Sequence, residues 1–134
     1  MARAPGASQS MNTPNRLDAI IVPEGVKKIT ATVDERLANA STFRVMREDH
    51  TVGNLVRMQM LRDPKVRFCG YRIPHPLEKD IEVLVQVKDG TSDSPLGALE
   101  RTVTHLESEL RWLQEKYRNS LRELQRRREL EFDE

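Results

Sequence analysis

The sequence predicts a small two-layer α+β domain, with a sheet of about four strands covered on one face by a short helix and a long C-terminal helix. Three observations support this fold class. Several short segments alternate apolar and polar residues, as strands do. One central segment has the broader apolar periodicity of a helix. The last part of the chain has a narrow apolar stripe that continues for about eight helical turns.

Length and composition exclude several classes of protein. The chain has 134 residues, enough for one hydrophobic core. Its 22 Lys and Arg residues nearly balance 21 Asp and Glu residues, so we expect no direct sequence-specific contact with nucleic acid. No apolar run approaches the roughly 20 residues that a membrane-spanning helix needs. No signal sequence is recognisable and the single cysteine cannot form an internal disulfide, so we expect an intracellular protein.

Three regions differ in composition and pattern. We expect residues 1–25 to form a flexible N-terminal extension and docking arm, because they combine prolines with only a short apolar patch at 19–22. Residues 26–130 are predicted to form the folded domain, including the long helix at 95–130. Residues 131–134 remain as a short tail.

Two strands are predicted before the first helix. In residues 27–33, Ile29, Ala31 and Val33 alternate with polar residues, as a half-buried strand requires. A second strand is predicted at 42–47, after a polar connection.

Two more strands are predicted after the first helix. Residues 66–73 have strand character that is broken by Gly70. Residues 81–87 carry apolar side chains mainly on one face and partly on the other, which predicts a central strand that is partly covered on both sides.

The first helix is predicted between these two pairs of strands. Asp49 or Thr51 is expected to cap its N-terminus, because a short polar side chain can accept the free backbone N–H groups there. The Asp63-Pro64 pair ends it, since the residue before a proline avoids the helical conformation. Its broad apolar face consists of Val52, Leu55, Val56, Met58, Met60 and Leu61.

The long helix is predicted from Pro95 to Leu130 and spans on the order of 50 Å, more than the width of the sheet. Its stripe has alternating steps of three and four residues: Leu96, Leu99, Val103, Leu106, Leu110, Leu113, Tyr117, Leu121 and Leu124. We expect residues 96–110 to cover the domain's own sheet. From Leu113 onward no sheet remains to be covered, which predicts association with another helix.

No catalytic, metal or cofactor site is predicted. The histidines lie on separate elements without zinc-ligand spacing, and Cys69 has no second thiol nearby. The glycines are scattered and form no phosphate-binding loop. Residues 48–50 fit a turn and helix cap better than acid–base chemistry. The basic residues 126–128 fit a solvated helix end.

Several motifs resemble the small alpha-like subunits of cellular RNA polymerases. They are residues 48–55 (EDHTVGNL), 61–64 (LRDP), 70–78 (GYRIPHPLE) and the striped helix. The family includes archaeal subunit L and the bacterial alpha N-terminal dimerisation domain, and the resemblance covers about three quarters of the chain. Residues 74–78 and 23–29 are most similar to the polymerase II version. The version shared by polymerases I and III is the alternative.

The resemblance implies a non-catalytic structural subunit that acts in the nucleus, in mRNA transcription. It implies a heterodimer with the larger alpha-like subunit, which serves as the assembly platform for the two largest polymerase subunits. Gly53 would allow close approach of the partner's backbone, and Asn54 would hydrogen-bond to neighbouring chain. The expected partner-binding residues are Val52, Gly53, Asn54, Leu55, Val56, Leu99, Val103, Leu106, Leu110, Leu113, Tyr117, Leu121 and Leu124.

Two further function classes are compatible with parts of the sequence. A homodimeric coiled-coil adaptor would use the same helical stripe but would not need the preceding sheet. A small enzyme would use His50 or His75, together with other polar groups in a pocket. The roles of residues 1–10 and of the helix beyond Gln125 stay open.

Overall fold

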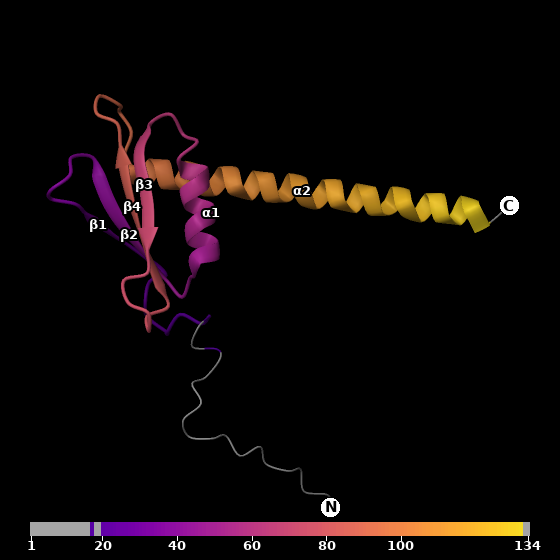
Figure 1. Cartoon of the computed structure of the whole chain (residues 1–134), viewed down its shortest axis with the longest axis horizontal. Coiled ribbons are helices and arrows are strands. Elements are labelled where there is room, and N and C mark those ends of the chain that lie inside the picture. The colour runs from indigo at the N-terminus through magenta and orange to yellow at the C-terminus, as the bar shows by residue number, and fades with distance from the viewer. Residues whose placement is uncertain (1–16, 18–19, 133–134) are drawn as a thin grey trace, which may run out of the picture.

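The computed structural model describes residue 17 and residues 20–132, with side chains described up to residue 130. The elements are β1 (Ile29–Val33), β2 (Ala40–Met46), α1 (His50–Met60), β3 (Val66–Arg72), β4 (Asp80–Val87) and α2 (Pro95–Phe132). The strands form one antiparallel sheet in the order β1-β2-β4-β3. Both helices lie on the same side of this sheet, and α2 continues far beyond it (Figure 1). The predicted two-layer α+β class is confirmed. Most of the predicted N-terminal extension and the last two residues lie outside the described residues.

The hydrophobic core lies between the sheet and the two helices. In β4 all of the residues on the helix side are buried, and the alternate ones after Asp80 are half-buried. This strand pairs with both β2 and β3, as expected for the central strand predicted at this position. From the helices, Met60 and Ala98 are fully buried, and Val52, Val56 and Leu99 pack against the same core.

Strand β1 forms where it was predicted, but it is not half-buried. All of its residues are exposed. Ala31 is paired with Phe43, so the apolar side of β1 faces the same way as the core side of β2. The prediction of a half-buried strand was wrong because β1 lies at the sheet edge and the helices cover the other strands.

Strand β3 continues through Gly70, so the predicted break there was wrong. Gly70 keeps its pairing with Leu84, and the only register shift in β3 lies between Val66 and Phe68. The ring of Phe68 lies over Gly70, where a Cβ atom would be 3.0 Å from its Cζ atom. The missing side chain at Gly70 therefore makes room for an aromatic ring instead of ending the strand.

Of the two residues predicted to cap the N-terminus of α1, Asp49 is the one that does so. The Asp49 carboxylate accepts a hydrogen bond of 2.9 Å from the backbone N–H of Thr51. This hydrogen bond lowers the pKa of Asp49. The helix ends at Met60, shortly before the Asp63-Pro64 pair.

Helix α2 is anchored to the domain at its first turns. The Arg101 guanidinium lies 2.5 Å from an Asp93 carboxylate oxygen and 2.8 Å from one of Asp63. Ser94 Oγ accepts a 3.0 Å hydrogen bond from the backbone N–H of Gly97, which caps the helix. Residues 111–132, which we call the overhang, extend beyond the domain, and all of them up to residue 130 are exposed (Figure 1).

Candidate subunit interface

The structure divides the predicted apolar face of α1 between two sides of the helix. Val52 and Val56 pack against the core of their own chain. Leu55 and Met58 lie on the outer side and are 46% and 50% exposed, and Leu61 at the end of the helix is 47% exposed. Sequence reasoning placed Met58 and Leu61 in the apolar face without assigning them to a partner. Successive steps of three residues from Leu55 to Met58 and on to Leu61 are the signal for a second stripe.

Gly53 and Asn54 make contacts within their own chain. Gly53 is buried, and a Cβ atom there would be 2.5 Å from the ring of Tyr71. Within the described chain, the close approach that Gly53 permits is therefore to Tyr71, and its contact with a partner stays a prediction. Asn54 Oδ1 accepts a 3.0 Å hydrogen bond from the Arg57 guanidinium one helical turn later.

Helix α2 packs on its own domain through small residues. Ala98 and Thr102 are 0% and 4% exposed, and the Thr102 hydroxyl donates a 2.8 Å hydrogen bond to the Ala98 carbonyl. These two positions each precede a stripe residue, Leu99 and Val103, so the most buried side of α2 lies beside the centre of the stripe. The domain therefore leaves much of the stripe uncovered.

The prediction that the first half of the stripe simply covers the sheet was only partly right. Leu99 packs against the core and Leu106 is half-buried, so these two residues do face the domain. Leu96, Val103 and Leu110 are 53%, 51% and 58% exposed. An open apolar surface thus begins on the domain and continues onto the overhang.

The second half of the stripe has no contact surface in the described chain. Its members are between 41% and 65% exposed: Leu113, Tyr117, Leu121 and Leu124. Ion pairs one turn apart, Arg111 with Glu107 and Arg127 with Glu123, accompany this part of the helix. A narrow apolar stripe between charged residues is typical of a helix that packs on another helix.

Trp112 lies on α2 outside the stripe and was not identified from the sequence. It is 60% exposed, and the Lys116 ammonium lies 5.7 Å from the centre of its ring. The three–four periodicity could not reveal it, because residue 112 falls between the stripe positions.

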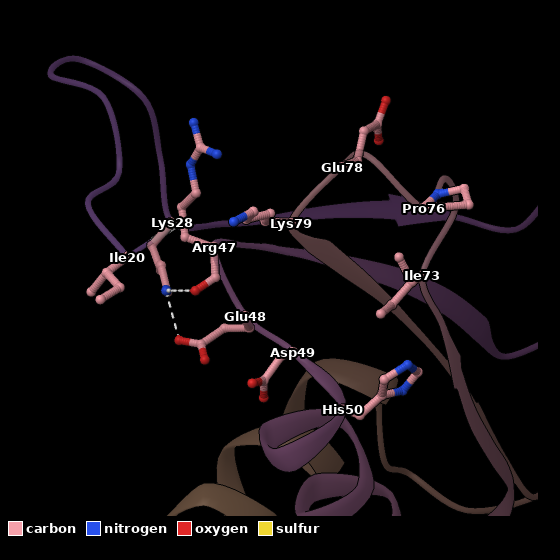
Figure 2. Close-up of a pocket in the computed structure, with 10 residues that line it drawn as sticks. All are labelled: Ile20, Lys28, Arg47, Glu48, Asp49, His50, Ile73, Pro76, Glu78 and Lys79. Atoms are coloured by element: carbon pink, nitrogen blue, oxygen red, sulfur yellow. Dashed lines mark hydrogen bonds and ion pairs between the residues drawn. The ribbon is translucent and has the colours of Figure 1, made fainter. Parts of the chain in front are cut away.

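A cavity of about 1050 Å³ opens where α1 meets the start of β1 and the turn between β3 and β4. Figure 2 shows its polar side chains, of which Lys28 lies against Glu48 at 2.6 Å. Asp49 caps α1, and Nδ1 of His50 lies 3.1 Å from the Tyr71 hydroxyl. These groups already have structural partners, and no nucleophile is oriented by a base among them.

Metal and membrane sites are equally unsupported in the described part of the chain. Within it no group of His, Cys, Asp and Glu side chains could hold a metal ion. None of the described helices has an apolar stretch of the length that a bilayer crossing requires. The Cys69 thiol is buried, and burial raises its pKa to about 11.

Comparison with known proteins agrees with this geometry. Residues 40–116 match the family model described as the RNA polymerase Rpb3/Rpb11 dimerisation domain. The DNA-directed RNA polymerase II subunit rpb11 of Dictyostelium discoideum is 38% identical over 107 residues, which are 80% of this chain and 88% of that protein. The probable DNA-directed RNA polymerase II subunit RPB11 of Caenorhabditis elegans is 38% identical over 104 residues, or 78% of this chain and 83% of that one.

The fold also occurs in a solved structure. DNA-directed RNA polymerase subunit L from Thermoplasma acidophilum superposes with a TM-score of 0.56. The match covers 70% of this chain and 90% of the archaeal one, at 23% sequence identity. At this identity the likeness shows a common fold.

Proposed function

This chain belongs to the RNA polymerase Rpb3/Rpb11 dimerisation domain family, and on that premise we propose that it is the small alpha-like subunit of a eukaryotic RNA polymerase II. In this role it pairs with the larger alpha-like subunit through residues 26–130. The pair is the platform on which the two largest subunits assemble, and it acts in the nucleus in mRNA transcription. Relatives that carry the polymerase II subunit name match most of the chain.

The observation that supports this function best is the exposed stripe of the overhang. Leu113 and Tyr117 are 58% and 65% exposed, on a helix that has already left its own domain. Burying what remains exposed of such side chains contributes roughly 1 kcal/mol apiece, so several of them together stabilise a specific complex. In the monomer these side chains stay exposed to water and add no stability. A helical partner that packs on the stripe buries them.

The outer side of α1 extends the proposed interface. Leu55 and Met58 are exposed on this helix, and α1 contacts α2 through Gln59, whose amide donates a 3.3 Å hydrogen bond to Glu109. The two helices thus form one layer over the sheet. A partner with a similar pair of helices closes a four-helix layer between two sheets.

A structural rather than catalytic role agrees with the polar groups of the described chain. His50 and Asp49 are engaged with Tyr71 and with the start of α1, and the cavity beside them contains no set of nucleophile, base and orienting group. The chain contributes to polymerase activity by assembly in this proposal. An enzyme acting through His50 or His75 gains no support.

Neither a subunit of polymerases I and III nor a homodimeric coiled-coil adaptor is favoured. The named relatives described above are polymerase II subunits, so the version shared by polymerases I and III has no comparable support. A homodimeric adaptor would leave the sheet domain without a role, although this domain contains the match to the family.

Co-expression with each candidate partner tests the proposal. The chain is produced with the larger alpha-like subunit of polymerase II and, separately, with the one shared by polymerases I and III. Light scattering after size exclusion then gives the mass of any complex. We expect a one-to-one heterodimer with the polymerase II partner only.

A pair of charge-matched variants tests the interface itself. Leu110→Glu with Leu113→Glu places two charges on the stripe, and we expect it to abolish the heterodimer. Ser108→Glu with Asn119→Glu adds the same charge on the opposite side of α2 and should leave it intact. All four positions are exposed, so the fold of the isolated chain should not change. A heterodimer that tolerates the stripe variant would contradict the proposed interface, and binding only the polymerase I and III partner would move the chain to those enzymes.

A further inference from the structure

The helix side of the sheet has an apolar area that neither α1 nor α2 covers. In β1, Ile29 and Val33 are 50% and 74% exposed. They lie on the same side of the strand as Ala31, which pairs with the buried Phe43. We call Ile29, Ala31 and Val33 the β1 strip. Single exposed apolar residues are ordinary, but three on one side of one strand form a continuous surface.

The β1 strip and the overhang lie at opposite ends of the molecule. The strand order places β1 at one edge of the sheet and β3 at the other. Helix α2 passes α1 and leaves the domain on the side away from β1 (Figure 1). The chain therefore has an open apolar helix at one end and an open apolar strand at the other.

We propose that the β1 strip receives the C-terminal helix of the larger alpha-like subunit. This inference rests on the proposed function, and it extends the interface from the two helices to the edge of the sheet. The family is named for a dimerisation domain of both partners, so the partner is taken to have a helix equivalent to α2.

The direction of the partner's helix follows from symmetry. Two copies of one fold that pair through the same surface are related by an approximate two-fold axis, and equivalent helices that run across this axis point in opposite directions. A partner placed beside the overhang of this chain therefore sends its own long helix back across α1. That path ends at β1, where the only uncovered apolar surface on this side of the described sheet lies.

The chemistry of the strip fits a helix. Two β-branched residues and an alanine make a flat apolar surface, against which an apolar helical stripe can pack as helices pack on sheets. The neighbouring Val45 is half-buried and continues the surface toward the core. The other side of β1 has Thr30 and Thr32, so only one side of the strand suits an apolar partner.

The two sides of β1 provide matched variants. Val33→Lys and Ile29→Lys place a charge on the strip, whereas Thr32→Lys and Thr30→Lys place it on the opposite side of the same strand. In the reconstituted heterodimer with the larger alpha-like subunit of polymerase II, isothermal titration calorimetry measures the dissociation constant. We expect each strip variant to raise it about tenfold and each threonine variant to leave it unchanged. Circular dichroism of the isolated chains checks that all four variants fold.

Photo-crosslinking identifies what covers the strip. A benzophenone amino acid is placed at position 33 or at position 32 in the heterodimer, and the cross-linked peptides are identified by mass spectrometry. We expect position 33 to cross-link to the long C-terminal helix of the partner and position 32 not to do so. Cross-links from position 33 to residues 1–19 of this chain, to a second copy of this chain or to no protein would overturn the inference.

The same experiments separate this inference from the proposed function. A heterodimer that is abolished by Leu110→Glu with Leu113→Glu but is indifferent to Val33→Lys supports the proposed function and overturns the role of β1. Failure of the wild-type chains to form any heterodimer overturns both.

Discussion

Tyr71 lies so close to Gly53 that a Cβ atom on the glycine would be 2.5 Å from ring atom Cδ2 and 3.0 Å from Cγ. The same tyrosine holds its hydroxyl 3.1 Å from Nδ1 of His50, at the first residue of α1. Bare backbone at Gly53 thus allows α1 to lie against β3. This contact of the glycine is within the domain.

Gly53→Ala should destabilise the isolated domain. Alanine favours a helix interior over glycine by about 1 kcal/mol, but the new methyl group overlaps ring atoms near the base of Tyr71, which a small rotation cannot move away. Overpacking of this kind costs about 1–3 kcal/mol, so we expect a net loss of about 1 kcal/mol in urea unfolding. Tyr71→Val should restore part of this loss in the double variant. Unchanged stability with weakened partner binding would instead place Gly53 in the interface.

The ion-pair cluster around Arg101 should make stability depend on pH. The Arg101 guanidinium lowers the pKa of Asp93. Burial alone would raise the pKa of Asp63, but hydrogen bonds from Arg101 and the Lys65 backbone outweigh it and the pKa is lowered. Unfolded aspartate has a pKa of roughly 3.9, so this contribution to stability is present above about pH 4 and is lost as the pH falls through the folded-state values.

We therefore expect Arg101→Met to lower the free energy of unfolding at pH 7, and the difference from wild type to shrink at about pH 3. Urea unfolding at both pH values gives this comparison. Arg111→Met is the control, because the partner of Arg111 in the described chain is the exposed Glu107 on the same helix. An Arg101→Met effect of equal size at both pH values would show that packing, not charge, anchors α2.

The overhang should exchange its amide hydrogens rapidly in the isolated chain. Most of the stability of helices in proteins comes from tertiary packing, and residues 111–130 are exposed throughout in the described chain. Residues 98–106 pack on the domain at Ala98 and Thr102 and should exchange more slowly. Hydrogen exchange with mass spectrometry should show new protection of the overhang on heterodimer formation. Slow exchange of the overhang in the dilute isolated chain would contradict this.

Cys69 should be unreactive while the domain is folded. Its side chain is 3% exposed, and its pKa is raised to about 11 by burial, so little thiolate exists at pH 8. We expect slow labelling by a chromogenic disulfide reagent in buffer and rapid labelling in urea, with the same midpoint as the loss of circular dichroism. Rapid labelling in buffer would show local opening of β3.

The local pattern of residues was enough to predict the elements. The cap at Asp49, the start of α2 at Pro95 and the strand at 81–87 all depend on neighbours within a few residues, and the structure has them at or close to these positions. The apolar stripe of α2 is also a local property, because helical geometry alone brings residues three and four apart onto one side.

Burial was harder to predict, because it depends on residues far apart in the sequence. Both sides of α1 are apolar, and only packing on the sheet decides that Val52 and Val56 face inward while Leu55 and Met58 face outward. The sequence pattern alone therefore could not fully distinguish the residues of α1 that are expected to bind a partner from those that pack in the core. Likewise, α2 packs on its own domain through the small residues Ala98 and Thr102. Much of the stripe therefore stays exposed even where the helix lies on the domain, as at Leu96.

By itself, the sequence determined the two-layer class, the order of the elements and the apolar stripe that suits a helical partner. These follow from periodicity and backbone preference, which act over a few residues. Only the tertiary structure decided that Gly53 accommodates Tyr71, that β3 runs through Gly70, and that β1 is an uncovered edge. The physical reason is that strand order and helix placement are set by contacts across the whole domain, and these contacts decide which apolar surface remains for another chain.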